Sequence, residues 1–332
     1  PNTNVCPVCL GHPGALPVMN QKAVDLAISA GLAFNCDIDK NQKMDRKKYF
    51  YPDLTKGYQI TQYDRPYARN GFVKLSSGKE VGLIEIHMEE DTGKSNHDEE
   101  GRALMDYNRA GVPLIEIVTK PEINSPDEAR DFVESLANTL RFLGVSDCIM
   151  AEGSMRCDVN INMVDLDNDI RTNISEIKNM NSIKAIEQAL AFEENRHKEL
   201  LEKGEIGIKE TRRWDDEKLE TIHMRHKEVG NDYRFSVDGD IPLINLTDEY
   251  IKNIKNNLPE LPYEKQSRYI KDFNMTEYDA NLLANDRQLA DLFEKTNKLV
   301  NDPKITANWI LTELSRRLNV TETRPEAVSY TH

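Results

Sequence analysis

The amino-acid sequence predicts an α+β fold, in which helices cover one face of a largely antiparallel sheet and leave its polar face open. Two observations support this class. Four short segments alternate polar and apolar residues, which is the two-residue period of a strand with one face in a core. Before, between and after these segments lie helical patterns, in which apolar residues recur at three- and four-residue spacing.

Each alternating segment carries at least one carboxylate. The segments are Leu83–Asp91, Leu114–Val118, Met155–Met163 and Ile174–Asn179. In the first, Glu85, His87 and Glu89 point away from Ile84, Ile86 and Met88. The last two segments contribute Arg156 and Asp158, and Glu176 and Lys178, respectively. We expect the segments to form one sheet face rich in oxygen and cationic groups. Such a face is suited to Mg²⁺ and phosphates, and indicates an enzyme that uses ATP.

Glu116 is the strongest single candidate, because it stands alone in the apolar segment Leu114–Val118. We expect it to be buried, and a buried carboxylate is costly unless it is paired. Glu116 should therefore meet a cation, a metal ion or water in a cleft. The run Glu89–Asp91 is also compatible with a solvated strand end. The charges around Asp158 are likewise compatible with a salt-bridged surface.

Size and composition limit the class of protein. The chain has 332 residues, which favours two domains. We expect a catalytic domain over residues 1–260 and the start of an all-helical domain over residues 261–332, with a break at Leu258–Pro262. A net charge of −14 argues against a broad nucleic-acid-binding surface, although a local basic patch remains compatible. Because the sequence has no bilayer-spanning apolar run, secretory signal or disulfide framework, we expect a cytoplasmic protein with no membrane partner.

Four helices are predicted from apolar spacing and end signals. They cover Gln21–Asn35, Pro126–Leu143, Ser182–Lys203 and Ile305–Leu318. The second has Ser125 as its N-cap and Gly144 as its C-terminal stop. The third is charged along much of its length, so we expect it on the outside. In the fourth, Trp309, Ile310 and Leu314 are expected along one apolar side.

Two short motifs indicate ligand binding with less specificity. Cys6 and Cys9 have the spacing of half a zinc site, and a redox pair is also compatible. Gly93–Ser95 resembles the end of a phosphate-binding P-loop, but Met88 stands where that motif requires glycine. A Walker motif is therefore excluded. Lys94, Ser95 and Arg156 remain candidate phosphate-binding residues.

Basic and aromatic residues interleave over Asp45–Asp53 and Lys56–Ile60. This pattern is a weak signature of base stacking and phosphate contact. A buried aromatic cluster with a basic rim explains it equally well. The sequence contains neither a G-x-S-x-G motif nor a cysteine with evident histidine support, so it offers no convincing acyl nucleophile.

Taken together, the motifs resemble those of the B subunits of the glutamyl/aspartyl-tRNA amidotransferases, the GatB/GatE family. The resemblance covers essentially the whole chain, and so many motifs in one order are highly specific. The matching stretches are Asn4–Gly11, Asp45–Lys47, Tyr49–Asp53, His87–Asp91, Asp106–Arg109, Pro113–Val118, Glu152–Asp158, Glu176–Ser182, Glu210–Arg213 and Asp232–Arg234.

The resemblance implies a glutamine-synthetase-like cradle of antiparallel sheet with helices behind it, followed by the helical domain. It implies ATP- and Mg²⁺-dependent phosphorylation of the side-chain carboxylate of Glu or Asp misacylated on tRNA. Ammonia from the amidase, which is the A subunit of these complexes, then displaces the phosphate. A small third component, the C subunit, braces the two large ones. Because an acyl phosphate already has a good leaving group, no protein nucleophile is needed.

The resemblance also assigns residues. Glu89 and Glu116 match the metal-binding carboxylates, whereas Glu90, Lys47 and Lys56 match positions near an ammonia tunnel. From the polar face we add Glu176 as a metal ligand, and Arg156, Asp158 and Lys178 as catalytic residues. The sequence lacks the family's N-terminal Ile-Gly-Leu-Glu-x-His strand, its upstream cysteine pair and its C-terminal tail. We therefore expect a fragment that is inactive alone.

Two internal motifs also differ from the family pattern. The family's Gly-Thr before the Glu176 segment is here Arg171–Thr172, and Phe235–Gly239 replaces its Tyr-Phe-Pro-Glu-Pro. Two other functions remain open. One is a non-catalytic scaffold that holds tRNA or the amidase, and the other is an ammonia ligase acting on a free amino acid. Substitution of Glu116 distinguishes the scaffold from a catalytic chain, because a scaffold would tolerate the change without loss of activity.

Overall fold

The structure is a computed structural model that describes residues 1–98, 100–226 and 232–321. The chain folds into two compact units. The first contains Pro1–Ser135 and Ile149–Asn256. The second contains Leu136–Cys148 and Asn257–His332, of which residues 322–332 are not described. The assignment of catalytic and helical domains at 260/261 stays a prediction.

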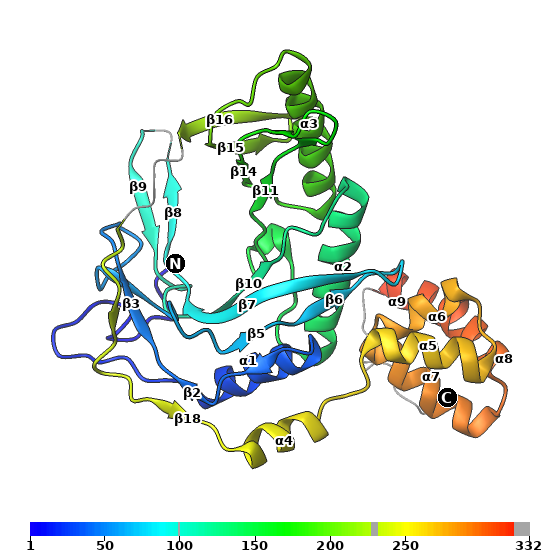
Figure 1. The fold of residues 1–332 in the computed structure, drawn as a ribbon. Helices are drawn as coiled ribbons and strands as arrows, with labels where there is room; N and C mark the ends of the chain where they lie inside the picture. Colours follow the sequence, from blue (N-terminus) through cyan, green and yellow to red (C-terminus); the bar gives the residue numbers. More distant parts are fainter. Residues whose placement is uncertain (99, 227–231, 322–332) are drawn as a thin grey trace. The chain divides into compact units, whose positions relative to one another are not determined.

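Helices and strands are mixed along the chain, and most paired strands are antiparallel, so the predicted α+β class is confirmed (Figure 1). The cradle architecture stays a prediction. The helices are α1 (Gln21–Ala33), α2 (Pro126–Leu143), α3 (Ile183–Glu202), α4 (Asp248–Asn256), α5 (Pro262–Phe273), α6 (Glu277–Ala284), α7 (Arg287–Val300), α8 (Pro303–Trp309) and α9 (Ser315–Thr321), with a 3₁₀ turn at Met150–Glu152 and a π-helical turn at Ile310–Leu314.

The strands fall into several separate sheets. They are β1 (Asp37–Ile38), β2 (Asn41–Gln42), β3 (Asp45–Lys48), β4 (Tyr58–Thr61), β5 (Ala68–Arg69), β6 (Phe72–Lys74), β7 (Glu80–Glu90), β8 (Lys94–His97), β9 (Ala103–Asp106), β10 (Pro113–Thr119), β11 (Val159–Ile161), β12 (Val164–Asp165), β13 (Ile170–Arg171), β14 (Ser175–Lys178), β15 (Glu210–Asp215), β16 (Glu220–His226), β17 (Ser236–Val237) and β18 (Ile244–Asn245).

The first large sheet has the order β1-β5-β7-β10, with β6 also paired to β7, and all these pairs are antiparallel. Ile86 and Met88 are buried beneath β7, as predicted. Ile84 was expected beside them, but its side chain is 45% exposed. The register explains the error: Val118 pairs with Glu85 and Thr119 with Leu83, so Ile84 is the extra residue of a β-bulge.

The second large sheet has the order β11-β14-β15-β16. The expectation that all four alternating segments share one sheet is therefore wrong, because β7 and β10 belong to the first sheet and β11 and β14 to the second. The β14–β15 pair is parallel, unlike its neighbours. Strand β11 is also shorter than predicted, so Arg156 and Asp158 lie before it. Alternation identifies a strand but carries no information about its partner.

A three-stranded sheet, β17-β3-β4, completes the part of the fold that positions the site. Strand β3 pairs with both neighbours, so that Lys47 lies opposite Gln59 and Asp45 lies opposite Thr61. The remaining strands form the two-stranded pairs β8–β9, β12–β13 and β18–β2.

Helices α1 and α2 form as their sequence signals predict. The Ser125 hydroxyl accepts the Glu128 backbone N–H at 3.1 Å, and Gly144 has a positive φ of 71° just beyond the end of α2. Gly31 lets α1 approach β5 closely, because an added Cβ would lie 3.1 Å from the Cβ of Ala68 and 2.8 Å from Ile38 Cδ1. Any larger residue there would push the helix away from the sheet.

Helix α3 was expected to lie on the outside because of its charge, but part of that charge is buried. It begins after Ser182, whose hydroxyl accepts the Ala185 backbone N–H, and it contacts β11 and β16. Glu193 and His197 lie on its buried stripe. Their partners on the second sheet satisfy them, and composition alone does not reveal such partners.

The second unit has a core built mainly from α5, α6, α7 and the segment around Ile310. Ile310 is buried as expected, whereas Trp309 is 63% exposed and does not share its side. The π-helical turn that begins at Ile310 changes the angle between successive side chains around the helix axis at this point. No helix among the described residues is both long and apolar enough to cross a bilayer.

Candidate metal centre

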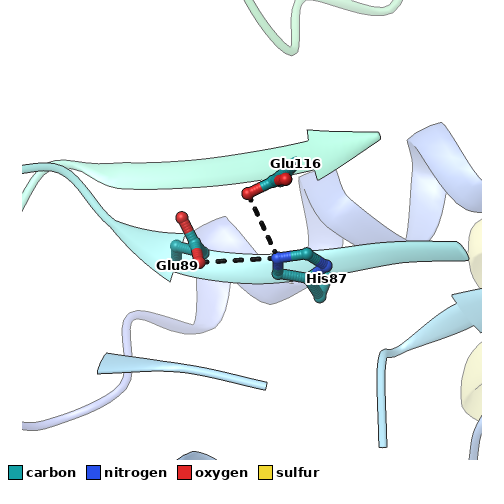
Figure 2. A group of neighbouring side chains, drawn as sticks. All are labelled: His87, Glu89 and Glu116. Carbon is teal, nitrogen blue, oxygen red and sulfur yellow. Dashed lines mark ion pairs between the residues drawn. The ribbon is translucent and has the colours of Figure 1, made fainter. Parts of the chain in front are cut away.

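Three potential metal ligands meet where β7 and β10 pair (Figure 2). His87 and Glu89 project from the same face of β7, and Glu116 lies opposite His87 in the β10 register. His87 Nε2 is 3.4 Å from Glu89 Oε1 and 3.4 Å from Glu116 Oε2. One ligand atom from each residue lies within 4.8 Å of the other two. We call these residues the metal-ligand group.

Glu116 is not buried, contrary to the expectation drawn from its apolar neighbours. Its side chain is 53% exposed, whereas that of Glu89 is 6% exposed. The reason is that the alternation of β10 places Glu116 on the polar face with His87, while the apolar Ile115 and Ile117 point to the other side. The group is thus anchored at Glu89 and open to solvent at Glu116.

The two carboxylates strongly stabilise positive charge on His87. Burial lowers the pKa of His87, but hydrogen bonds to Glu116 and Glu89 outweigh it and raise this pKa to about 9. In return, the hydrogen bond from His87 lowers the pKa of Glu116. Without a bound cation, the imidazole therefore supplies the positive charge between the two carboxylates at neutral pH.

Two side chains of β4 hold Glu89 in place. The Thr61 hydroxyl donates a hydrogen bond of 2.8 Å to Glu89 Oε1, and the Gln59 amide donates one of 3.1 Å to Glu89 Oε2. Both β4 residues are buried. Fixed partners of this kind orient a metal-binding carboxylate, and they tie the three-stranded sheet to the metal-ligand group.

Lys178 forms a second charged cluster on β14. Its ammonium pairs with Asp158, which precedes β11, and lies 3.4 Å from Glu176 Oε1. Burial lowers the pKa of Lys178, but its bond to Asp158 more than compensates and the pKa is raised. The charges of Lys47 and Lys178 both help to lower the pKa of Glu116, so lysines from two other sheets act on the metal-ligand group. Glu176, predicted as a metal ligand, pairs with Lys178 and accepts a bond from Thr211 of 3.0 Å.

Arg156 is held by a buried carboxylate at the end of β7. Arg156 Nη2 is 2.9 Å from Asp91 Oδ2, and Arg109 Nε lies 3.3 Å from the same oxygen. Asp91 is buried, while Arg156 is exposed. This arrangement leaves the Arg156 guanidinium accessible to an anion.

Glu90 and Lys56 form an ion pair, with Lys56 Nζ 2.7 Å from Glu90 Oε1. Glu90 Oε1 also accepts the backbone N–H of Ile60 at 3.0 Å. The pair lines a cavity of about 20 Å³, which also involves Cys9 and Gly111. That volume holds about one water molecule. The predicted tunnel residues Glu90 and Lys56 are thus together, whereas Lys47 lies among aromatic rings.

The structure places the other predicted residues away from the metal-ligand group. Lys94 and Ser95 are exposed on β8, and in the described ranges neither bonds to that group. The Cys6 and Cys9 sulfurs are 3.3 Å apart. Among the described residues, no third ligand atom completes a metal group with them.

His87 is the site residue that the sequence assignment missed. It was placed on the polar face, but only the carboxylates were assigned to metal binding. Its position between Glu85 and Glu89 was the available signal, since all three share one face of a strand. The supporting roles of Gln59 and Thr61 had no sequence signal, because they depend on the distance between β4 and β7 in space.

The fold and the site define an α+β chain with a histidine–carboxylate group suited to a divalent cation. Residues 1–252 match the family model described as the GatB/GatE catalytic domain. The chain belongs to the GatB/GatE family.

Curated relatives agree with this assignment. The chain is 55% identical over 332 residues to the B subunit of the aspartyl/glutamyl-tRNA(Asn/Gln) amidotransferase of Finegoldia magna, covering 99% of this chain and 70% of that protein. It is 50% identical over 324 residues to the protein of the same name from Clostridium tetani, covering 96% and 68%. The Clostridium botulinum Kyoto protein of that name is 48% identical over 323 residues, with the same coverage.

Proposed function

We propose that this chain catalyses the ATP-dependent step of tRNA-dependent amidation. In that step, the side-chain carboxylate of Glu or Asp on a misacylated tRNA attacks the γ-phosphorus of ATP and releases ADP. Ammonia then attacks the acyl phosphate, and phosphate leaves as the amide forms. The names of the relatives support the overall reaction, and the metal-ligand group with its flanking lysines is the observation that supports the phosphoryl-transfer step.

The metal-ligand group fits a divalent cation such as Mg²⁺. Two carboxylates and an imidazole converge, and the exposed side of Glu116 leaves room for water or phosphate oxygens. The cation would supply the positive charge that protonated His87 now places between the two carboxylates. When bound, it would neutralise charge on the phosphates and help to align them.

The chain's own residues supply the remaining electrostatics. Asp158 orients Lys178, and Asp91 orients Arg156. Both cations can stabilise the negative charge on a transferring phosphoryl group. Lys94 and Ser95 are a further candidate phosphate contact. Such fixed charges lower a barrier because they need not reorganise during the reaction. The site also needs no nucleophile, since the substrate carboxylate attacks directly.

The proposed partners follow from the same reaction. The amidase, or A subunit, would supply ammonia, and the small C subunit would brace the assembly. The Lys56–Glu90 pair beside its small cavity would lie on the ammonia route. Zinc at Cys6 and Cys9 would be structural and would need further ligands.

Glu116→Gln tests the proposed function, since it removes one charge from a half-exposed position. In the complete complex, we expect ATP-dependent activation of the misacylated tRNA to fall by at least about 100-fold, because loss of a charged transition-state contact typically has that size. Assembly, measured by size-exclusion chromatography, should be unchanged. Glu199→Gln, at an exposed position on α3, is the matched control. Full activity of Glu116→Gln would support the scaffold alternative instead.

A further inference from the structure

A single arginine binds the corner of the chain at which β7 ends. Arg109 Nε donates a hydrogen bond of 3.1 Å to the Thr92 carbonyl, and Arg109 Nη2 donates one of 3.0 Å to the Gly93 carbonyl. The same Nε lies 3.3 Å from Asp91 Oδ2. Arg109 therefore contacts three consecutive residues, and these follow directly on the strand that carries two of the three metal ligands.

The same guanidinium also meets the segment that supplies Arg156. Gly153 has a positive φ of 80°, and a Cβ added there would lie 3.8 Å from Arg109 Nη1, so the turn at Gly153 comes close to Arg109. Arg156 follows three residues later, and its Nη2 is 2.9 Å from Asp91 Oδ2. Arg109 thus bridges the end of β7 and the segment before β11.

The Asp91 carboxylate is shared by two guanidinium groups. Its Oδ2 faces both Arg109 and Arg156, while its Oδ1 accepts the Thr92 backbone N–H at 2.8 Å. The exposed fraction of the side chain is 8% for Asp91, 33% for Arg109 and 47% for Arg156. Because arginine stays charged, one carboxylate cannot neutralise both cations. The three residues therefore keep a net positive charge, and Arg156 is the more exposed of the two cations.

This bonding pattern requires an arginine at position 109. The guanidinium donors lie in a planar fork, so Nε and Nη2 can bond the end of β7 while Nη1 faces another segment. A lysine would carry the same charge, but its single nitrogen cannot reach all of these positions at once. Strand pairing already fixes the Asp91 backbone, whose N–H bonds the Val112 carbonyl at 2.8 Å and whose carbonyl accepts the Gly111 N–H at 2.9 Å. Only the Asp91 side chain is left to be oriented.

We propose that Arg109 is a positioning residue, which holds the Asp91 carboxylate and shares its charge, so that Arg156 keeps a fixed orientation and a positive charge for the phosphates of ATP. This inference rests on the proposed function for the identity of the anion. Loss of Arg109 would leave Asp91 to pair with Arg156 alone, and it would release the turn at Gly153. Arg156 would then be both more fully neutralised and less ordered.

The test measures the binding of inorganic tripolyphosphate, with Mg²⁺ in excess, to the complete protein in its native complex by isothermal titration calorimetry. Tripolyphosphate carries the phosphates of ATP without the nucleoside, and its binding needs no turnover. We expect Arg156→Gln to weaken binding by roughly 10- to 150-fold, as loss of a hydrogen bond between charged groups predicts. Arg109→Gln should weaken it by roughly 3- to 30-fold, which is the size of a coupling between neighbouring residues.

The double variant gives the sharpest comparison. Because Arg109 acts through Arg156, Arg109→Gln should change binding by less than about twofold in an Arg156→Gln background. Arg109→Lys keeps the charge but not the fork, so it should fold and still weaken binding, by less than Arg109→Gln does. Arg102→Gln, which removes an exposed charge just before β9, is the matched control and should have no effect.

Two outcomes would overturn the inference. One is a loss from Arg109→Gln that is equally large in the Arg156→Gln background, which a merely structural role or an effect through Lys94 on β8 predicts. The other is unchanged binding in Arg109→Gln, or no binding of tripolyphosphate by the unmodified protein. If a separate turnover assay showed no phosphoryl transfer while the coupling between Arg109 and Arg156 remained, the proposed function alone would fail, so the two failures can be told apart.

Discussion

At the scale of single residues, the two nitrogens of the His87 ring have different surroundings. Nε2 faces Glu89 and Glu116, whereas Nδ1 is buried and has no hydrogen-bond partner in the described part of the chain. Glu85 Oε1 lies 4.0 Å from Nδ1, slightly beyond bonding distance. A metal-binding histidine usually donates its second N–H to such a carboxylate. We infer that Glu85 orients His87 when a cation binds.

Glu85→Gln should therefore weaken cation binding without removing a ligand. The expected loss is roughly 10- to 100-fold in affinity for Mn²⁺ as a probe, because supporting partners of metal ligands have effects of that size. Titration monitored by electron paramagnetic resonance measures it. Glu80→Gln, an exposed change on the same strand, is the control. Equal affinities in both variants would exclude the orienting role.

At the scale of elements, the β-bulge in β7 separates two isoleucines that look equivalent in sequence. Ile86 is buried beneath the sheet, while Ile84 is the unpaired bulge residue. The polar face remains in register beyond the bulge, so Glu85, His87 and Glu89 still align. The bulge thus determines which apolar residues stabilise the sheet.

Ile86→Ala should destabilise the first unit by about 2–5 kcal/mol, because it leaves a cavity in a packed core. Ile84→Ala should cost less than about 1 kcal/mol, as is usual for an exposed change. Urea unfolding followed by fluorescence of the buried Trp214, in a Trp309→Phe background, measures both. Similar losses in the two variants would contradict the register.

Helix α3 joins the second sheet through a buried charge network. Glu193 accepts hydrogen bonds from Arg196 and Thr221, and Arg212 Nε lies 3.1 Å from Glu193 Oε1. Burial raises the pKa of Glu193, but its bonds to His197, Arg196 and Thr221 outweigh this and lower the pKa to about 2. Because the folded-state pKa lies below the ordinary 4.5, Glu193 stabilises the folded state above about pH 5.

That stabilisation should be lost as the pH falls from about 5 to about 2, and its full size is about 3 kcal/mol. Glu193→Gln should therefore reduce the decline in unfolding free energy over this range, as measured by urea unfolding at several pH values. It should also destabilise the protein at pH 7, because it leaves Arg196 and Arg212 to share the single carboxylate of Glu210. Glu194→Gln, an exposed neighbour on the same helix, should keep the original pH dependence. An identical pH dependence for both variants would count against the network.

At the scale of the whole molecule, three sheets of the first unit contribute charge to one place. Glu89 and Glu116 come from the β7–β10 pair, Lys178 comes from β14, and Lys47 comes from β3. The Asp91–Arg156 pair links the end of β7 to the segment before β11. The electrostatics of the site therefore depend on the folding of the unit as a whole.

Lys178→Gln tests this convergence. In the complete complex, we expect kcat for ATP-dependent activation to fall by roughly 100- to 1,000-fold, as for loss of one transition-state charge contact. The melting temperature reports any structural effect of leaving Asp158 unpaired. Lys184→Gln, on the exposed side of α3, removes the same charge and should leave kcat unchanged. An unchanged kcat in Lys178→Gln would exclude the role that we propose for this lysine.

The sequence alone determined the features that depend on near neighbours. Ser125 and Gly144 mark the ends of α2, and alternation along β7 identifies the polar face, because caps and strand periodicity are local properties of the backbone. The motifs also identified the family. Glu89 and Glu116 were chosen as metal ligands on this basis, and the structure brings them together.

Tertiary structure alone decided the rest. The division of four strands between two sheets, the exposure of Glu116 and the position of His87 Nε2 depend on strand pairing. The burial of Glu193 depends on the packing of α3 against the second sheet. A strand pattern specifies which residues share a face, but the same face can meet solvent, a helix or another sheet. That choice is made by contacts between residues far apart in the chain, which is why the convergence of charges around Glu116 is evident only in the folded protein.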